Sequence, residues 1–338
     1  MTFFPSHRST PASQSPSRPA PSASPEPEMP SAPAEPERFP VAQPRYTLEE
    51  VVMPESAVGA VNAALARLAH HHTLYEDWDL GAIDPTGRRA VINLHGPPGT
   101  GKSMCAEGIA HRLGRPILTV SYAELESKYV GDTPKNIVAV FSAARTADAV
   151  LFFDEADSIL GRRLTSVTQS ADHGVNVSRA MMLTQLDGFD GVVVFATNLM
   201  RNYDEAFVRR ILAHVELPLP DLPCRTRLAT RFLRPRMPLA ADVTVAWLAD
   251  QSEGLSGGEM KQVVIAAASR AVARPAETRR VDRDDLAAEL GNLRQARRAV
   301  RGEPTLAEPR VTETIEPCPA HLRSVVIPNE DQRPPTEV

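Results

Sequence analysis

Hydrophobic and polar positions divide the chain into a patterned middle and two flanks without periodicity. Four short apolar runs are expected to be strands: 91–94, 117–120, 150–153 and 192–196. Helical spacing occurs in four further stretches: 60–70, 104–113, 134–145 and 175–187. The last two strand candidates are almost continuously apolar, which is typical of strands buried on both faces of a parallel sheet. This alternation predicts an α/β domain in which helices cover both faces of a parallel sheet.

Strand signals fade after about residue 221. Four segments from there on have helical character: 225–233, 243–251, 258–272 and 282–297. Glu259 follows Ser256 at the interval of a capping box, which favours a helix start at that point. We therefore predict an α/β domain over residues 45–220 and a small all-helical domain over 221–300.

The two ends of the chain are rich in proline and polar residues. Residues 1–44 combine Pro, Ser and Ala and bury too little apolar surface to fold, so we predict a disordered arm with some polyproline II character. The arm could be a solvated tether or could dock a partner. Residues 301–338 are expected to be a loose tail, although 324–328 could add a short strand.

Composition narrows the class of protein. The 338 residues carry a net charge of −5, which argues against a general nucleic-acid or membrane-surface protein. The three cysteines are scattered and show no metal-binding spacing, so a reducing, cytoplasmic location is expected. We find no apolar run long enough for a membrane span and no secretory signal core.

Residues 96–103 form the G-x-x-x-x-G-K-S phosphate loop: Gly96, Pro97, Pro98, Gly99, Thr100, Gly101, Lys102 and Ser103. Glycines allow the backbone to aim successive N–H groups at phosphate oxygens. Lys102 can reach the β- and γ-phosphates, and the Ser103 hydroxyl can ligate Mg²⁺. A strand candidate precedes the loop and a helix candidate follows it, so the phosphates would lie at a helix N-terminus.

Polar residues follow two of the predicted strands. Asp154 and Glu155 come directly after the strand at 150–153, and Asn198 follows the strand at 192–196. The carboxyl ends of parallel strands form the ligand edge of such folds. We expect Asp154 to complete the Mg²⁺ shell with Ser103, Glu155 to polarise the attacking water, and Asn198 to position it. The alternative is that the two acids merely cap a helix and that Asn198 is an ordinary turn residue.

Arg209 and Arg210 lie on a helix expected to begin near Asp204. Adjacent arginines at a helix end are usually surface charges. In a ring assembly they would instead face the neighbour's γ-phosphate, where an arginine supplied in trans accelerates hydrolysis strongly.

Together these motifs resemble the AAA ATPases of the katanin–spastin and proteasomal group, from about Tyr46 to Val300. Six segments carry the resemblance: 96–103, 124–131, 151–157, 196–198, 204–210 and 254–260. The resemblance implies a P-loop NTPase domain with a helical lid, ATP and Mg²⁺ as cofactors, and a homo-oligomeric, hexameric ring that works on a protein substrate. It adds nucleotide contacts by three residues beyond the phosphate loop and Asp154: Met104, Gly257 and Gly258. It also implies that Lys128, Tyr129 and Val130 form a pore loop gripping an extended polypeptide, with 164–178 as a second, flexible channel loop.

The chain departs from the family pattern at several positions. Residues 49–54 replace the usual acidic–Ile-Gly-Gly segment, so the sequence does not identify the residues near Val52 that would contact adenine. His95 stands where an aromatic residue is common, Ile211 where Phe is expected, and His214 where a third basic residue often lies. The zinc-protease motif H-E-x-x-H of one family branch is absent.

The sequence therefore predicts an ATP-driven protein remodeller. A nucleotide-gated scaffold or assembly factor that does not thread its partner is the alternative. A DNA loader is a weaker third interpretation, because the chain lacks a basic stripe.

Overall fold

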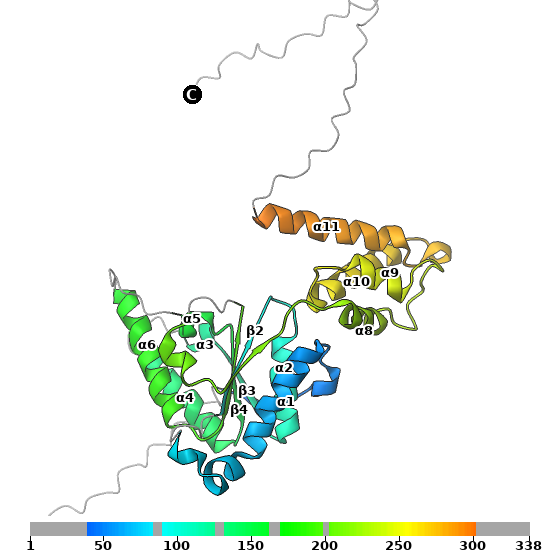
Figure 1. The fold of residues 1–338 in the computed structure, drawn as a ribbon. Helices are drawn as coiled ribbons and strands as arrows, with labels where there is room; N and C mark the ends of the chain where they lie inside the picture. The colour runs from blue at the N-terminus through cyan, green and yellow to red at the C-terminus, as the bar shows by residue number, and fades with distance from the viewer. Residues whose placement is uncertain (1–38, 84–89, 126–131, 162–169, 199–202, 302–338) are drawn as a thin grey trace, which may run out of the picture.

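The computed structural model describes residues 39–83, 90–125, 132–161, 170–198 and 203–301. Within them a sheet of strand order β1-β3-β4-β5-β2-β6 forms the centre of the N-terminal part (Figure 1). Its strands are β1 (Val41–Ala42), β2 (Ala90–His95), β3 (Ile117–Ser121), β4 (Val150–Asp154), β5 (Val192–Thr197) and β6 (Ala213–Glu216). All pairings are parallel except that of β1 with β3. The predicted α/β fold class is confirmed.

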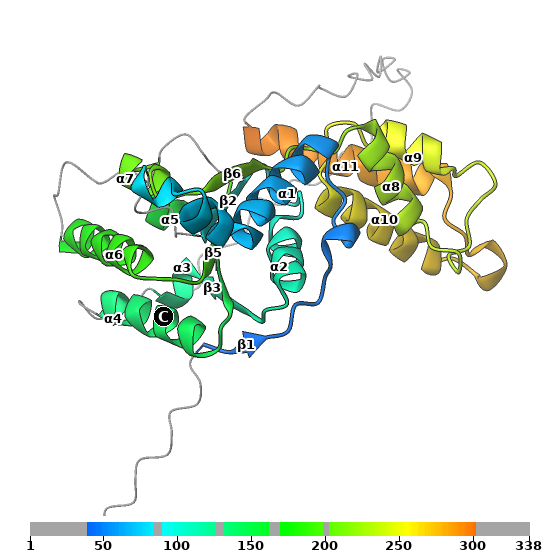
Figure 2. The same ribbon diagram turned by 60° about the horizontal axis from the view of Figure 1, so that its bottom comes forward.

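Helices cover both faces of the sheet (Figures 1 and 2). One face packs on α1 (Glu55–Ala69) and α2 (Lys102–Leu113) through strand residues such as Ile92 and Phe152. The other packs on α4 (Asp132–Thr146), α5 (Asp157–Leu160) and α6 (Ser170–Asp187) through residues such as Leu151 and Phe153. Consecutive strand residues thus face opposite layers, which explains why the central strands are apolar at nearly every position.

Short elements connect these layers: η1 (Leu48–Glu50), η2 (Thr73–Asp77), η3 (Leu80–Ala82), α3 (Tyr122–Leu125) and α7 (Glu205–Val208). Asp204 caps α7 by accepting a hydrogen bond from the Ala206 N–H at 2.9 Å. The helix ends at Val208, so Arg209 and Arg210 follow it rather than lie on it.

Two edge strands, β1 and β6, were not predicted from the sequence. Val41–Ala42 forms β1 within the segment that we assigned to the arm, and Phe39 and Val41 pack against the core. Ala213–Glu216 forms β6 beside β2. A strand of two residues and one of four that contains His and Glu give little apolar signal, and pairing with a central strand supplies the order instead.

The expectation of a flexible channel loop over 164–178 was wrong for its second half. Helix α6 begins at Ser170 and includes Gly174. A single glycine costs a helix only about 1 kcal/mol, and the nearby Ser178 and Arg179 are buried against the domain. Residues 164–169 and the predicted pore loop Lys128, Tyr129 and Val130 lie outside the described residues.

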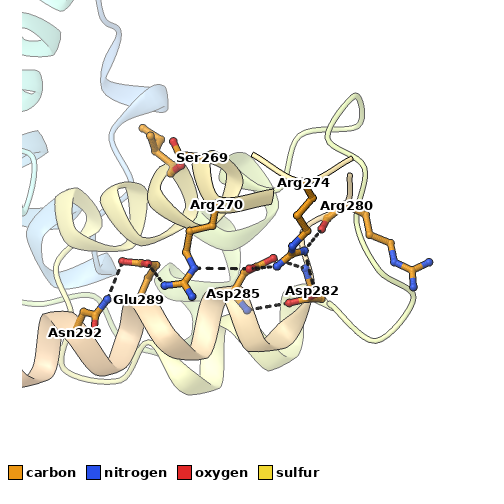
Figure 3. A network of polar contacts seen from close by, with 9 residues as sticks. Ser269, Arg270, Arg274, Arg280, Asp282, Asp285, Glu289 and Asn292 are labelled. Carbon is orange, nitrogen blue, oxygen red and sulfur yellow. Dashed lines mark hydrogen bonds and ion pairs between the residues drawn. The ribbon is translucent and has the colours of Figure 1, made fainter. Parts of the chain in front are cut away.

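Residues 222–301 form a helical unit with its own apolar core. Its helices are α8 (Leu222–Phe232), α9 (Val245–Gln251), α10 (Gly257–Val272) and α11 (Arg283–Arg301), with the short η4 (Ala276–Thr278). Arg270 of α10 and Arg274, two residues beyond its end, pair with Asp285 and Glu289 in the first half of α11 (Figure 3). None of the helices in the described ranges is long and apolar enough to cross a membrane.

Candidate active site

The phosphate loop connects β2 to α2 at the carboxyl edge of the sheet. Gly101 precedes Lys102, the first residue of α2, in a left-handed conformation with φ of 98°. At Gly96, where φ is 143°, an added Cβ would lie 2.2 Å from the Leu217 carbonyl oxygen. Only glycine fits these positions, so the motif's glycines are required by the turn as well as by close approach to phosphate.

Lys102 is buried and its ammonium group is fully hydrogen-bonded. Its Nζ donates to the carbonyl oxygens of Gly96 and Pro97 at 2.8 and 2.9 Å, and to Asn198 Oδ1 at 2.8 Å. Burial lowers the pKa of Lys102, and the attraction of Asp154 and Asp157 opposes that change. A cation held in this way, at the mouth of a helix N-terminus, can exchange loop carbonyls for phosphate oxygens when an anion enters.

Ser103 and Asp154 meet beside the loop. The Ser103 Oγ donates to Asp154 Oδ2 at 2.9 Å, across 51 residues of sequence. A hydroxyl and a carboxylate are the hard oxygen donors that Mg²⁺ prefers, and this ion usually takes only one or two protein ligands beside phosphates and water. The pair therefore fits the predicted metal position. The described residues contain no cluster of three or more His, Cys, Asp or Glu that could hold a metal alone.

Glu155 and Asn198 lie on the same edge of the sheet. Glu155 has φ of 52°, which is strained for a residue with a side chain, and its N–H donates to Asp154 Oδ1 at 2.9 Å. Its side chain is exposed and lines the same cleft as Lys102. Asn198 donates from its backbone N–H to the Asp157 carboxylate at 3.2 Å, which fixes the turn after β5.

These residues line a cleft of about 510 Å³ between the α/β domain and the helical unit. Two hydrogen bonds cross it: Gly258 N–H to the Gly99 carbonyl at 2.9 Å, and Arg231 Nη1 to the Glu50 carbonyl at 2.6 Å. The predicted residues Met104, Val52 and Gly257 also line it. Sequence reasoning missed several further lining residues: Tyr46, Leu217, Leu228, Arg231, Phe232 and Lys261.

The chain is similar to one known family and to several known proteins. Residues 92–219 match the model of the "ATPase family associated with various cellular activities (AAA)". Residues 92–219 thus match an AAA domain. Proteasome-activating nucleotidase of Methanosarcina mazei is 36% identical over 205 residues, 59% of this chain and 47% of that protein. A katanin p60 ATPase-containing protein of Danio rerio is 35% identical over 213 residues, 58% of this chain and 43% of that protein.

The chain thus spans about half the length of the curated relatives it matches. Among solved structures, the FIGL-1 AAA domain in complex with ADP aligns with a TM-score of 0.58 at 26% identity. That alignment covers 74% of this chain and 85% of the other, so it extends beyond the 128 residues matched by the family model.

The two arginines of this AAA domain occupy different environments. Arg209 is exposed over 79% of its side chain, and its Nη2 lies 3.6 Å from Oε2 of the similarly exposed Glu205. Arg210 makes a bidentate ion pair with Asp187 of α6, and this pair raises its pKa. Neither residue is among those lining the described cleft of its own protomer.

A buried polar cluster lies beneath the site. Asn93 interrupts the apolar β2 and is fully buried, with its Nδ2 3.4 Å from both Tyr203 Oη and His214 Nδ1. The Tyr203 hydroxyl also bonds to Thr197 Oγ1. The cluster therefore connects the end of β5, just before Asn198, to Tyr203, which precedes the Asp204 cap of α7. Our sequence analysis placed Asn93 in an apolar run and did not predict these partners.

Proposed function

We propose that this AAA protein binds Mg²⁺-ATP in the cleft and hydrolyses it. The observation that carries the proposal is the convergence of Lys102, Ser103–Asp154, Glu155 and Asn198 at one sheet edge. Bound Mg²⁺ would be held by Ser103 and Asp154 and would neutralise charge on the β- and γ-phosphates. Lys102 and the loop N–H groups hold the triphosphate, while Gly257 and Gly258 close the cleft from the helical unit.

In the proposed reaction, water attacks the γ-phosphorus, the bond to the β,γ-bridging oxygen breaks, and ADP and phosphate leave. Glu155 accepts a hydrogen bond from the water and Asn198 holds its position. The strained backbone of Glu155 supports this assignment, because strain of this kind concentrates at functional positions. Arg209 and Arg210 of a neighbouring protomer would stabilise the charge that develops on the transferred phosphoryl group.

The test is Glu155→Gln, measured by phosphate release and by binding of a fluorescent ATP analogue. We expect hydrolysis to fall by at least about 10²-fold with binding retained, while Lys102→Ala loses binding. Glu253→Gln, which changes an exposed acid of the helical unit, is the matched control. Hydrolysis that survives in Glu155→Gln would overturn the catalytic assignment.

We further propose that the protein forms a hexameric ring that remodels a protein substrate. Support comes from the kinship with proteasome-activating nucleotidase and katanin p60 proteins. Tyr129→Ala separates this function from that of a scaffold. A remodeller should lose substrate unfolding and keep basal hydrolysis, whereas a scaffold should be unaffected.

A further inference from the structure

Arg297, on the last helix of the helical unit, binds the start of α10. Its Nε donates to Glu259 Oε1 at 2.7 Å and its Nη2 to Glu259 Oε2, which makes a bidentate pair. Its Nη1 donates to the Gly254 carbonyl at 2.9 Å. All five donors of a guanidinium lie in one plane, so two fixed acceptors hold the side chain in one orientation.

Glu259 is also part of the cap of α10. Its Oε2 accepts hydrogen bonds from the Ser256 N–H and the Ser256 Oγ, both at 2.8 Å, and its own N–H reaches Ser256 Oγ at 3.4 Å. Burial raises the pKa of Glu259, but the bonds from Ser256 and the pair with Arg297 outweigh burial and keep it below the ordinary value. The carboxylate is therefore charged and fixed in the first turn of the helix.

That first turn lies against the phosphate loop. Gly258 donates its N–H to the Gly99 carbonyl, and Gly257, Gly258 and Lys261 line the cleft. Ser256 is buried, and its Oγ would lie 2.7 Å from a Cβ added to Gly99. The Glu259 carboxylate is thus separated from the loop by a single hydroxyl group.

This arrangement creates an electrostatic conflict. The N-terminus of α10 favours a polyphosphate, because the helix dipole gives this end of the helix partial positive charge. A carboxylate in the same turn repels a polyphosphate, unless a cation neutralises the carboxylate.

We propose that Arg297 is a positioning residue for nucleotide, which neutralises Glu259 and fixes its cap so that α10 can close on the phosphate loop. The inference rests on the proposed ATP site and assigns to it a residue of α11, nearly two hundred positions along the chain from Lys102. Arg297 does not line the cleft and acts through Glu259 and Ser256.

The experiment measures the dissociation constant of a fluorescent ADP analogue with Mg²⁺ in the full chain. Arg297→Ala should weaken binding about three- to tenfold, because the Glu259 charge in the first turn of α10 is then no longer neutralised. Arg298→Ala changes the exposed neighbour on the same helix and should bind like wild type. Adding Glu259→Gln to Arg297→Ala should restore most of the affinity, since the amide oxygen still accepts from Ser256.

A purely structural role predicts the opposite for the double variant, which would then bind as weakly as Arg297→Ala or more weakly and overturn the inference. If Arg297→Ala does not fold, Glu259→Gln alone decides: binding at wild-type strength or tighter supports the inference, and weaker binding overturns it. The proposed function fails separately, if wild type itself does not bind the analogue or if Lys102→Ala binds it equally well.

Discussion

Arg210 and Asp187 form a bidentate ion pair, with 2.7 Å from Nε to Oδ1 and 2.8 Å from Nη2 to Oδ2. Arg210 also donates from Nη1 to the Ala206 carbonyl, so one guanidinium connects α6 to α7. The adjacent Arg209 makes an exposed contact with Glu205. The two arginines that sequence treats as equivalent are therefore different: one is held within its own protomer, while the other projects from it.

This difference predicts separable effects of their replacement. Arg210→Ala should lower the free energy of unfolding by about 1–2 kcal/mol, because it removes charged hydrogen bonds in a partly covered site. Arg209→Ala should change stability by less than about 0.5 kcal/mol and should reduce ATP hydrolysis by up to about 10³-fold if it acts in trans. Urea denaturation and phosphate release measure the two quantities. Equal stability of the two variants would contradict the structural distinction.

Two helical glycines should respond oppositely to alanine. Nothing lies within 4 Å of a Cβ added to Gly59 on α1, so Gly59→Ala should stabilise the protein by about 0.5–1 kcal/mol through helix propensity. A Cβ on Gly108 of α2 would lie 3.0 Å from the Leu48 backbone nitrogen and 2.9 Å from its Cδ2. Gly108→Ala should therefore destabilise by about 1–3 kcal/mol and displace η1, which leads into the cleft wall at 50–54. Urea titrations of both variants decide, and stabilisation by Gly108→Ala would show that the assigned packing is wrong.

Local sequence was sufficient for the parts of the site that are contiguous. The phosphate loop needs glycines, lysine and serine at fixed spacing, and an apolar strand ending in Asp154 must deliver that side chain to the sheet edge. The fold class and the resemblance to the AAA family followed from the same segments. These residues are brought together by the parallel sheet itself, because the carboxyl ends of its strands meet at one edge, so their proximity could be predicted without the strand order.

The remaining parts depend on contacts that no local pattern encodes. Arg231 reaches the Glu50 carbonyl across 181 positions, and Arg297 reaches Glu259 across 38. Arg231 is an ordinary polar position on an amphipathic helix until the helical unit is placed against the α/β domain, and Arg297 is one until α11 packs on α10. Asn93 could have been noticed, because an amide in a buried strand requires partners, but nothing in the sequence names Tyr203 or His214 as those partners.

Two histidines near the phosphate loop should make stability depend on pH. Burial lowers the pKa of His95, with Glu216 opposing and Lys102 adding to the effect, and burial together with His95 lowers the pKa of His214. As the pH falls below 6.5, the ordinary pKa of histidine, these side chains bind protons in the unfolded chain more readily than in the folded chain. The free energy of unfolding therefore falls as the pH falls. The slope is at most about 1.4 kcal/mol per pH unit for each histidine.

The measurement is the free energy of unfolding between about pH 7.5 and 5.5, a range above that in which carboxylates ordinarily titrate. His95→Phe should flatten the slope in this range. His111→Gln, which changes an exposed histidine of α2, should leave it as in wild type. A slope unchanged by His95→Phe would show that His95 is not held neutral.

The cluster around Asn93 should behave as a coupled unit. Tyr203→Phe removes the hydroxyl that faces Asn93 and Thr197, and leaving buried polar atoms without partners costs about 1–3 kcal/mol. Asn93→Leu should be destabilising for the same reason. The double variant should lose less than the sum of the two, because each replacement removes a partner that the other leaves unsatisfied. Strictly additive losses would mean that the two side chains do not interact.

We expect the largest loss of stability from a single charge replacement in the helical unit at the ion pair of Asp285. Asp285 is 2% exposed at the start of α11, where Arg274 pairs with it and Arg270 lies 3.8 Å away (Figure 3). Arg274 also donates hydrogen bonds to Asp282 and to the Arg280 carbonyl. Its removal would leave the buried Asp285 carboxylate with the more distant Arg270 as its counter-ion among the residues that the structure describes.

Arg274→Ala should therefore cost about 3 kcal/mol and should increase hydrogen exchange along α10 and α11, without a matching increase in β2 or β5. Arg280→Ala is the control, because only its carbonyl takes part in the network, and it should have little effect. Removing Asp285 together with Arg274 should recover part of the loss, since no unpaired charge then remains buried. If the double variant were instead less stable than Arg274→Ala, the main role of Asp285 would be to accept the hydrogen bond from the Asp282 N–H at the start of α11. Its charge would then not be what destabilises Arg274→Ala.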